Sequence, residues 1–167
     1  FPPHDVLVLG DGLAIDGVGE ALDKALRRQG EVSVTLGPAV DVGLATPKDF
    51  DWAAAMRGAL DKHRPDVLVL VAGRNDRQKP RGLDGRPARG SGGGRLVDPA
   101  ALYESRVRGL LTLPAASKIP ILLVAAPPAK ARASKKVPWV PDALAGACRA
   151  TAGCTFVGDA FTDPSPP

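Results

Sequence analysis

The chain has 167 residues, of which 44% are hydrophobic and 24% are charged, and its formal net charge is +4 at pH 7. These proportions are ordinary for a soluble globular protein, and the length suits one domain with a full core. No run approaches the roughly 18 apolar residues that a membrane span needs, and no signal peptide is visible, so no transmembrane segment is expected.

Short aliphatic runs predict four buried β-strands, and a weaker run predicts a fifth. In chain order the runs cover residues 6–9, 32–36, 67–71, 119–124 and 155–157. Segments with apolar residues at helical spacing lie between them. The first apolar stripe consists of Val18, Leu22, Ala25 and Leu26, the second of Trp52, Met56, Ala59 and Leu60, and the third of Leu102, Val107, Leu110 and Leu111.

Three of the expected helices have a recognisable start. Asp51 suits the N-cap of the second helix, and Asp98 suits that of the third, with Pro99 at the first helical position. A fourth helix begins at Pro141 and runs towards Cys148. Apolar strands that alternate with amphipathic helices indicate a parallel sheet covered on both faces. We therefore expect a flavodoxin-like, three-layer α/β/α sandwich with about five parallel strands, which binds ligands beyond the carboxyl ends of its strands.

Three motifs follow the expected strands, and together they carry a family resemblance. They read Gly10-Asp11-Gly12-Leu13, then Val-Gly-Leu-Ala-Thr-Pro-Lys-Asp-Phe-Asp-Trp over residues 42–52, then Gly-Arg-Asn-Asp-Arg-Gln over residues 73–78. The chain resembles the SGNH/GDSL hydrolases, in particular a bacterial branch with the patterns G-D-S-L, G-L-x-x-P-D-F-x-D-W and G-x-N-D-R-Q. The resemblance implies a single domain over residues 1–163, with a basic Gly-rich insertion at about 77–98 and a Pro-rich tail over 164–167.

The resemblance also implies a chemistry and a set of site residues. Members of the family hydrolyse esters or transfer acyl groups, often on O-acetylated carbohydrate, through a serine, a base and an oxyanion pocket. Carried over by position, that pocket consists of Gly12, Gly43 and Asn75. Asp11 and Asp76 carry over as residues that organise their loops. No metal or cofactor is expected.

The chain departs from the family pattern at the groups that do the chemistry. Gly12 stands where the family has the nucleophilic serine. Neither histidine replaces the base, because His4 precedes the first strand and His63 is expected at the opposite edge of the sheet. Asp159 and Asp163 have no histidine three residues later, so the sequence shows no Asp-x-x-His block. Losing the nucleophile alone costs on the order of a millionfold in turnover in a measured triad.

Two functional hypotheses follow. The leading one is a catalytically degenerate domain, a pseudoenzyme, that acts as a binding or assembly module and protein complex subunit in a bacterial envelope. The alternative is a GDSL-type esterase or O-acetyl transferase on cell-wall or capsular carbohydrate, present in a truncated or inactivated form. A simpler interpretation also stands for the motif residues alone: Gly10 and Gly12 make a tight turn, and Asn75 and Asp76 cap their own backbone. A dinucleotide-binding fingerprint is rejected, because Ile15 replaces its third glycine.

Basic residues gather in two segments that follow strand ends. The first set is Arg77, Lys79, Arg81, Arg86, Arg89 and Arg95, and the second is Lys130, Arg132, Lys135 and Lys136. A rim of this kind attracts polyanions, such as an anionic glycan, a lipid surface or an acidic protein. The alternative is a solvated flexible loop, which the Gly-rich stretch 90–94 favours. Because no aromatic residue stands in either segment, specific nucleic-acid binding is not expected.

The two cysteines, Cys148 and Cys154, leave two interpretations open. They could form a small disulfide across a helix-to-strand turn, or they could be two unrelated buried thiols. A disulfide would imply an oxidising compartment, in agreement with a periplasmic or secreted protein. Two such ligands are too few for a zinc site of their own.

Overall fold

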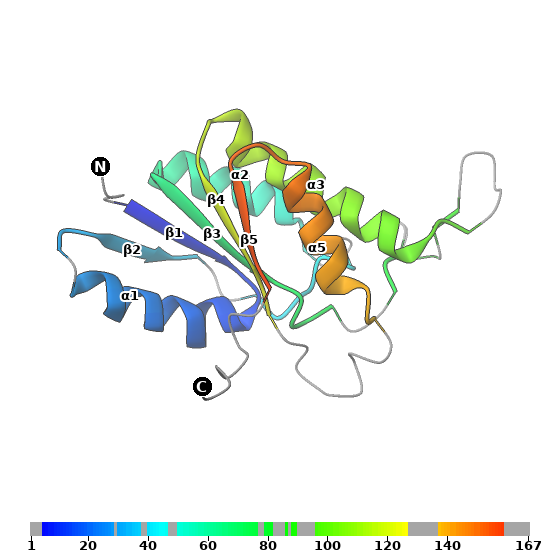
Figure 1. Cartoon of the computed structure of the whole chain (residues 1–167), viewed down its shortest axis with the longest axis horizontal. Coiled ribbons are helices and arrows are strands. Elements are labelled where there is room, and N and C mark those ends of the chain that lie inside the picture. Colours follow the sequence, from blue (N-terminus) through cyan, green and yellow to red (C-terminus); the bar gives the residue numbers. More distant parts are fainter. Residues whose placement is uncertain are drawn as a thin grey trace, which may run out of the picture.

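The structure is a computed structural model that describes residues 5–28, 30–37, 40–46, 50–76, 79–81, 86, 88–89, 96–126 and 137–158. Five strands and five helices occur in this part of the chain (Figure 1). In chain order they are β1 (Asp5–Gly10), η1 (Ala14–Gly19), α1 (Glu20–Arg27), β2 (Ser33–Leu36), α2 (Trp52–His63), β3 (Val67–Ala72), α3 (Pro99–Ala116), β4 (Ile121–Ala125), α5 (Val140–Arg149) and β5 (Cys154–Val157).

The five strands form one parallel sheet in the order β2-β1-β3-β4-β5. Each strand coincides with one of the five predicted runs, and no end differs by more than two residues. The parallel pairing requires a crossover between successive strands, and the helices between them provide these crossovers. The predicted flavodoxin-like α/β fold is therefore confirmed.

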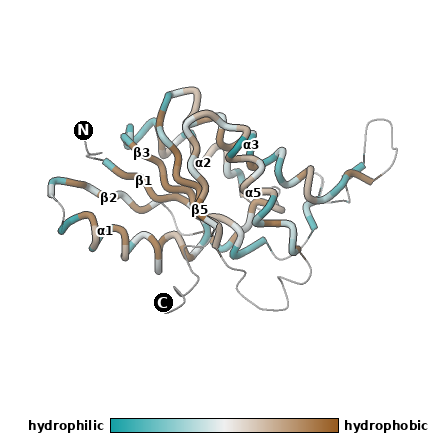
Figure 2. The backbone as a smooth tube through the Cα atoms, in the orientation of Figure 1, coloured by the Kyte–Doolittle hydropathy of each residue, from teal (hydrophilic) through white to brown (hydrophobic). Residues whose placement is uncertain are grey.

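The residue pattern of the central strands decides which helix covers which face. In β1 and β3 valine alternates with leucine, so that Leu7 and Leu68 point to one face while Val8 and Val69 point to the other. The leucine face packs against α2, α3 and α5, and the valine face packs against η1 and α1 (Figures 1 and 2). This alternation produces the three predicted layers, with an apolar sheet between helices whose outer sides are polar.

The predicted helix starts are also confirmed for α2 and α3. Asp51 accepts a hydrogen bond from the backbone N–H of Ala54 at 2.8 Å, and Asp98 accepts one from Ala101 at 3.2 Å. The segment after β1 differs from the expected single helix. It starts as the π-helical η1 and continues as α1, and Ala25 of the predicted stripe is exposed.

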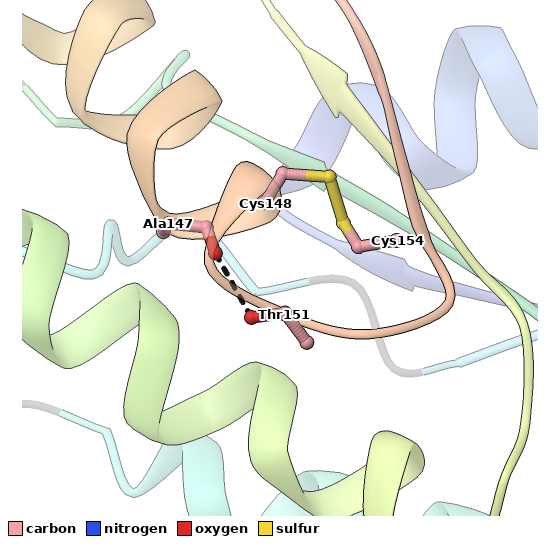
Figure 3. Close-up of a disulfide and its surroundings, with 4 residues drawn as sticks. All are labelled: Ala147, Cys148, Thr151 and Cys154. Carbon is pink, nitrogen blue, oxygen red and sulfur yellow. Dashed lines mark hydrogen bonds between the residues drawn. A yellow bond between two sulfur atoms is a disulfide. The ribbon is translucent and has the colours of Figure 1, made fainter.

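The two cysteines form a disulfide in the structure. Cys148 lies at the end of α5 and Cys154 starts β5, and their α-carbons are 5.3 Å apart (Figure 3). The turn between them is further held by Thr151, whose hydroxyl donates to the carbonyl of Ala147 at 2.9 Å. The bridge therefore ties the last helix of the described chain to the edge strand of the sheet. Among the described helices, none is long and apolar enough to cross a membrane.

Candidate functional site

The carboxyl ends of β1 and β3 lie side by side, and the motif residues follow directly after them. Gly10 at the end of β1 pairs with Val71 of β3, and the next residue, Asp11, continues the sheet by a parallel bridge to Val40. Val40 and Asp41 therefore lie beside Asp11 and Gly12, just before η1 begins. The loop after β3, with Asn75 and Asp76, meets both of these segments.

Asp11 connects the first motif to the third. Its side chain is 2% exposed, and its carboxylate accepts the backbone N–H groups of Leu13 and Asn75, both at 3.3 Å. Burial raises the pKa of Asp11 to about 6, and these two backbone hydrogen bonds oppose the rise. Asp11 thus fixes the backbone on both sides of the site.

Asp76 connects the third motif to the second. It is 1% exposed, and its two oxygens accept from the Ala45 backbone N–H at 2.8 Å and from the Tyr103 hydroxyl at 2.5 Å. Burial raises the pKa of Asp76, while the bond from Tyr103 lowers it. The pKa of Tyr103 is raised well above its ordinary value by its own burial and by the charge of Asp76. The Gly43–Ala45 segment is therefore anchored through Asp76 to α3.

Two of the motif glycines are required by close backbone contacts. A β-carbon on Gly10, whose φ is +148°, would lie 2.1 Å from the carbonyl oxygen of Val71. A β-carbon on Gly43 would lie 2.3 Å from Oδ1 of Asp76 and 2.8 Å from the carbonyl carbon of Asn75. Both glycines thus allow neighbouring segments to approach each other, which no other residue would permit without a shift.

Gly12 stands in a different environment, since among the described residues only the carboxylate of Asp41 would lie within 4 Å of a β-carbon there. A β-carbon on Gly12 would lie 2.9 Å from Oδ1 of Asp41, and the same oxygen accepts from Nδ2 of Asn75 at 3.4 Å. The structure thus brings Gly12, Gly43 and Asn75 together, as the sequence led us to expect. It adds the carboxylate of Asp41 between Gly12 and the Asn75 amide.

Asp41 and Tyr103 were missed by sequence reasoning for different reasons. Asp41 precedes the Gly43-Leu44 motif in a polar loop, and nothing in the sequence distinguishes it from a solvated residue. Tyr103 could have been found, because it stands four residues before Val107 on the same stripe of α3. Its complete burial, with its hydroxyl on Asp76, shows that it belongs to the core.

The predicted basic rim is only partly within the described residues. Lys79 and Arg81 are exposed, and the backbone N–H of Arg81 donates to the Ala45 carbonyl at 3.3 Å, so this segment adjoins the site. Arg77, Lys130, Arg132 and Lys135 lie outside the described residues, as do Asp159 and Asp163. His63 ends α2 just before β3 begins, at the opposite edge of the sheet from Gly12. Within the described chain, no cluster of three or more histidine, cysteine or acidic residues could hold a metal ion.

An apolar cavity of about 370 Å³ lies beside the site. Its walls come from the second motif, from the first turn of α2 and from α3: Leu44, Phe50, Asp51, Trp52, Ala53, Arg106, Gly109 and Leu110. Leu44 and Trp52 also line a narrow hollow of about 10 Å³ above Asp11 and Asp76. The cavity and this hollow therefore share two wall residues, Leu44 and Trp52.

The five-stranded parallel sheet with its covering helices is the α/β fold of an SGNH-hydrolase-like domain. Solved structures of esterases share this fold. AlinE4, an SGNH-hydrolase family esterase, is 18% identical and matches 94% of this chain and 76% of its own, with a TM-score of 0.64. The psychrotrophic esterase EstA from Pseudoalteromonas sp. is 17% identical and matches 92% and 77%, with a TM-score of 0.58. TesA is 18% identical and matches 87% and 69%, with a TM-score of 0.51.

The chain belongs to the family described as "Protein of unknown function (DUF459)", whose sequence pattern matches residues 5–164. A search of curated proteins gave no significant match.

Proposed function

We propose that this chain is a catalytically degenerate SGNH-type domain that acts as a binding or assembly module in a bacterial envelope. The observation that carries the proposal is the group found where an attacking hydroxyl would stand. Gly12 offers no side chain there, and Oδ1 of Asp41 lies 2.9 Å from where its β-carbon would be and accepts from the amide of Asn75. Without the nucleophile, a triad mechanism loses on the order of a millionfold in turnover.

The charge of Asp41 supports the same conclusion. An oxyanion pocket works because donors are aimed at a charge that develops during the reaction. Here the Asn75 donor already faces a carboxylate, and a second negative charge developing beside it would be repelled. The Asn75 amide is therefore poorly placed to stabilise a tetrahedral intermediate.

The envelope location is supported by the disulfide between Cys148 and Cys154, because such bonds persist in oxidising compartments. The exposed Lys79 and Arg81 beside the site support an anionic ligand, such as an acidic or acylated glycan, a lipid surface or an acidic protein partner. Attraction of this kind weakens as salt is added.

A second function is favoured by a specific observation. Gly43 and Asn75 keep the positions that the resemblance assigns to oxyanion donors, and the compared structures include esterases. An esterase or O-acetyl transferase acting on cell-wall or capsular carbohydrate is therefore the competing proposal. It requires a nucleophile other than a side chain of Gly12.

Hydrolysis of an acetyl ester separates the two proposals. We expect the native chain to show no turnover above that of Gly12→Ala, which fills the same space without a hydroxyl. Gly12→Ser should add at most a slow rate, since no described histidine lies at this edge of the sheet. Turnover by the native chain well above the Gly12→Ala control would contradict the proposal. Efficient rescue by Gly12→Ser would show that a working base faces the site.

A further inference from the structure

The 370 Å³ cavity beside the site has the size and walls of a small-molecule pocket. Its volume lies within the range of known ligand pockets, and its lining is mainly apolar. If each non-hydrogen atom takes about 30 Å³, as a water molecule does in the liquid, the cavity holds roughly ten to twelve such atoms. Leu44, Trp52 and Leu110 provide the apolar walls.

Two charged residues, Arg106 and Asp51, stand among the described residues of this mainly apolar wall. The guanidinium of Arg106 donates to the carbonyl oxygens of Ala45, at 3.0 Å, and of Arg81. Both acceptors are neutral, and neither ion pair found in the described part of the chain includes Arg106. Arg106 is half-buried, and this burial lowers its pKa. An anion in the cavity would supply the missing charge.

Trp52, another residue of the cavity wall, carries a donor without an acceptor. Its indole Nε1 is fully buried and donates to no described residue. Buried polar groups without a partner are uncommon. Asp51 caps the N-terminus of α2 by accepting the N–H of Ala54, and neither ion pair of the described chain joins it to Arg106. That helix end offsets the negative charge of Asp51.

We propose that this cavity binds a small carboxylic acid as its anion, with the carboxylate against Arg106 and an apolar chain of about seven to nine carbons against Leu44 and Leu110. The inference rests on the proposed function, in which this domain binds a ligand without converting it, and it names the chemical class of that ligand. A carboxylate suits this wall because it matches the planar donor geometry of a guanidinium.

Calorimetric titration of the native chain with sodium octanoate and with octanamide tests the proposal. The two probes share the same chain and differ in charge. We expect octanoate to bind at least about tenfold more tightly than octanamide, since hydrogen bonds to charged groups exceed neutral ones by such a factor. Arg106→Gln, which can still donate to the Ala45 and Arg81 carbonyls, should remove most of this preference. Arg108→Gln, on the exposed side of the same helix, should leave it unchanged.

The two tryptophan indole N–H signals in a nitrogen–proton NMR spectrum locate the binding. The signal of Trp52, assigned with Trp52→Phe, should shift on addition of octanoate, while that of Trp139 serves as an internal reference. Undetectable binding of octanoate at millimolar concentration, equal affinity for octanamide, or a shift confined to Trp139 would each overturn the inference. Hydrolysis of p-nitrophenyl octanoate by the native chain would instead contradict the proposed function. The titration would then still decide whether octanoate binds in the cavity.

Discussion

The hydrogen bond between Tyr103 and Asp76 is the contact on which the site's architecture depends most. Tyr103→Phe removes the hydroxyl and keeps the ring, which stands edge-on to Trp139 with centroids 5.5 Å apart. The change leaves one oxygen of Asp76, a residue that is 1% exposed, without its donor. Hydrogen bonds to charged groups contribute about 1.5–3 kcal/mol, and an unpaired buried charge costs more. We expect Tyr103→Phe to lower the free energy of unfolding by about 3 kcal/mol at pH 8.

The pH dependence of this loss separates a charged hydrogen bond from simple packing. Because the hydroxyl lowers the raised pKa of Asp76, its removal moves that pKa further up. The variant then binds a proton at a pH where the native protein does not, and neutralising the carboxyl relieves part of the cost. The loss should therefore be smaller at pH 5 than at pH 8.

Urea denaturation of both proteins at the two pH values measures the effect. Thr112→Val is the matched control, since it removes a hydroxyl from an exposed position of the same helix, where Thr112 donates only to the Gly109 carbonyl. It should change the free energy of unfolding by less than about 0.5 kcal/mol. A loss below 1 kcal/mol for Tyr103→Phe, or one that does not vary with pH, would refute the reasoning about Asp76.

Three further predictions concern the same region and the disulfide. Burial raises the pKa of Asp11 from 3.8 to about 6, so the folded state binds more protons than the unfolded state between these values. Stability should therefore fall by about 3 kcal/mol as pH rises through this window, and chemical denaturation of Asp11→Asn at several pH values should show a smaller fall. Gly10→Ala should destabilise the protein by about 2–3 kcal/mol in urea denaturation, because its β-carbon meets the backbone of β3. Gly12→Ala should cost less than about 0.5 kcal/mol, because only the exposed side chain of Asp41 has to move; equal losses would contradict this contrast. Reducing the Cys148–Cys154 bond should lower the free energy of unfolding by about 2 kcal/mol, as expected for so short a loop; an unchanged denaturation midpoint with reductant would argue against it.

The fold could be predicted because each strand and helix is marked by a short sequence pattern, and the same patterns recur along the chain. Each buried strand is a continuous aliphatic run, and parallel strands joined by helices leave few arrangements. The N-caps Asp51 and Asp98 could be recognised because capping needs a particular side chain at a particular place. The π-helical turn of η1 could not be predicted, because its apolar residues keep a spacing that an ordinary α-helix also allows.

The contacts of the site were harder to predict from the sequence, because they join segments that lie far apart in the chain. The motifs predicted that Gly12, Gly43 and Asn75 would meet, because each follows or flanks a strand of the same sheet edge. They could not predict that Asp41 would face Gly12, which depends on the path of the loop over residues 40–46. The neutral partners of Arg106 depend likewise on the packing of α3 against that loop.

The central claim is that no side chain of this site forms a covalent intermediate with an ester. Intact-mass measurement after incubation with a reactive alkyl phosphonate ester tests it most directly, because such a reagent labels an activated nucleophile whatever its residue type. The account predicts that the native chain keeps its unmodified mass. A stoichiometric adduct that peptide mapping places on Asp41, or on any other residue at the carboxyl ends of β1 and β3, would contradict it.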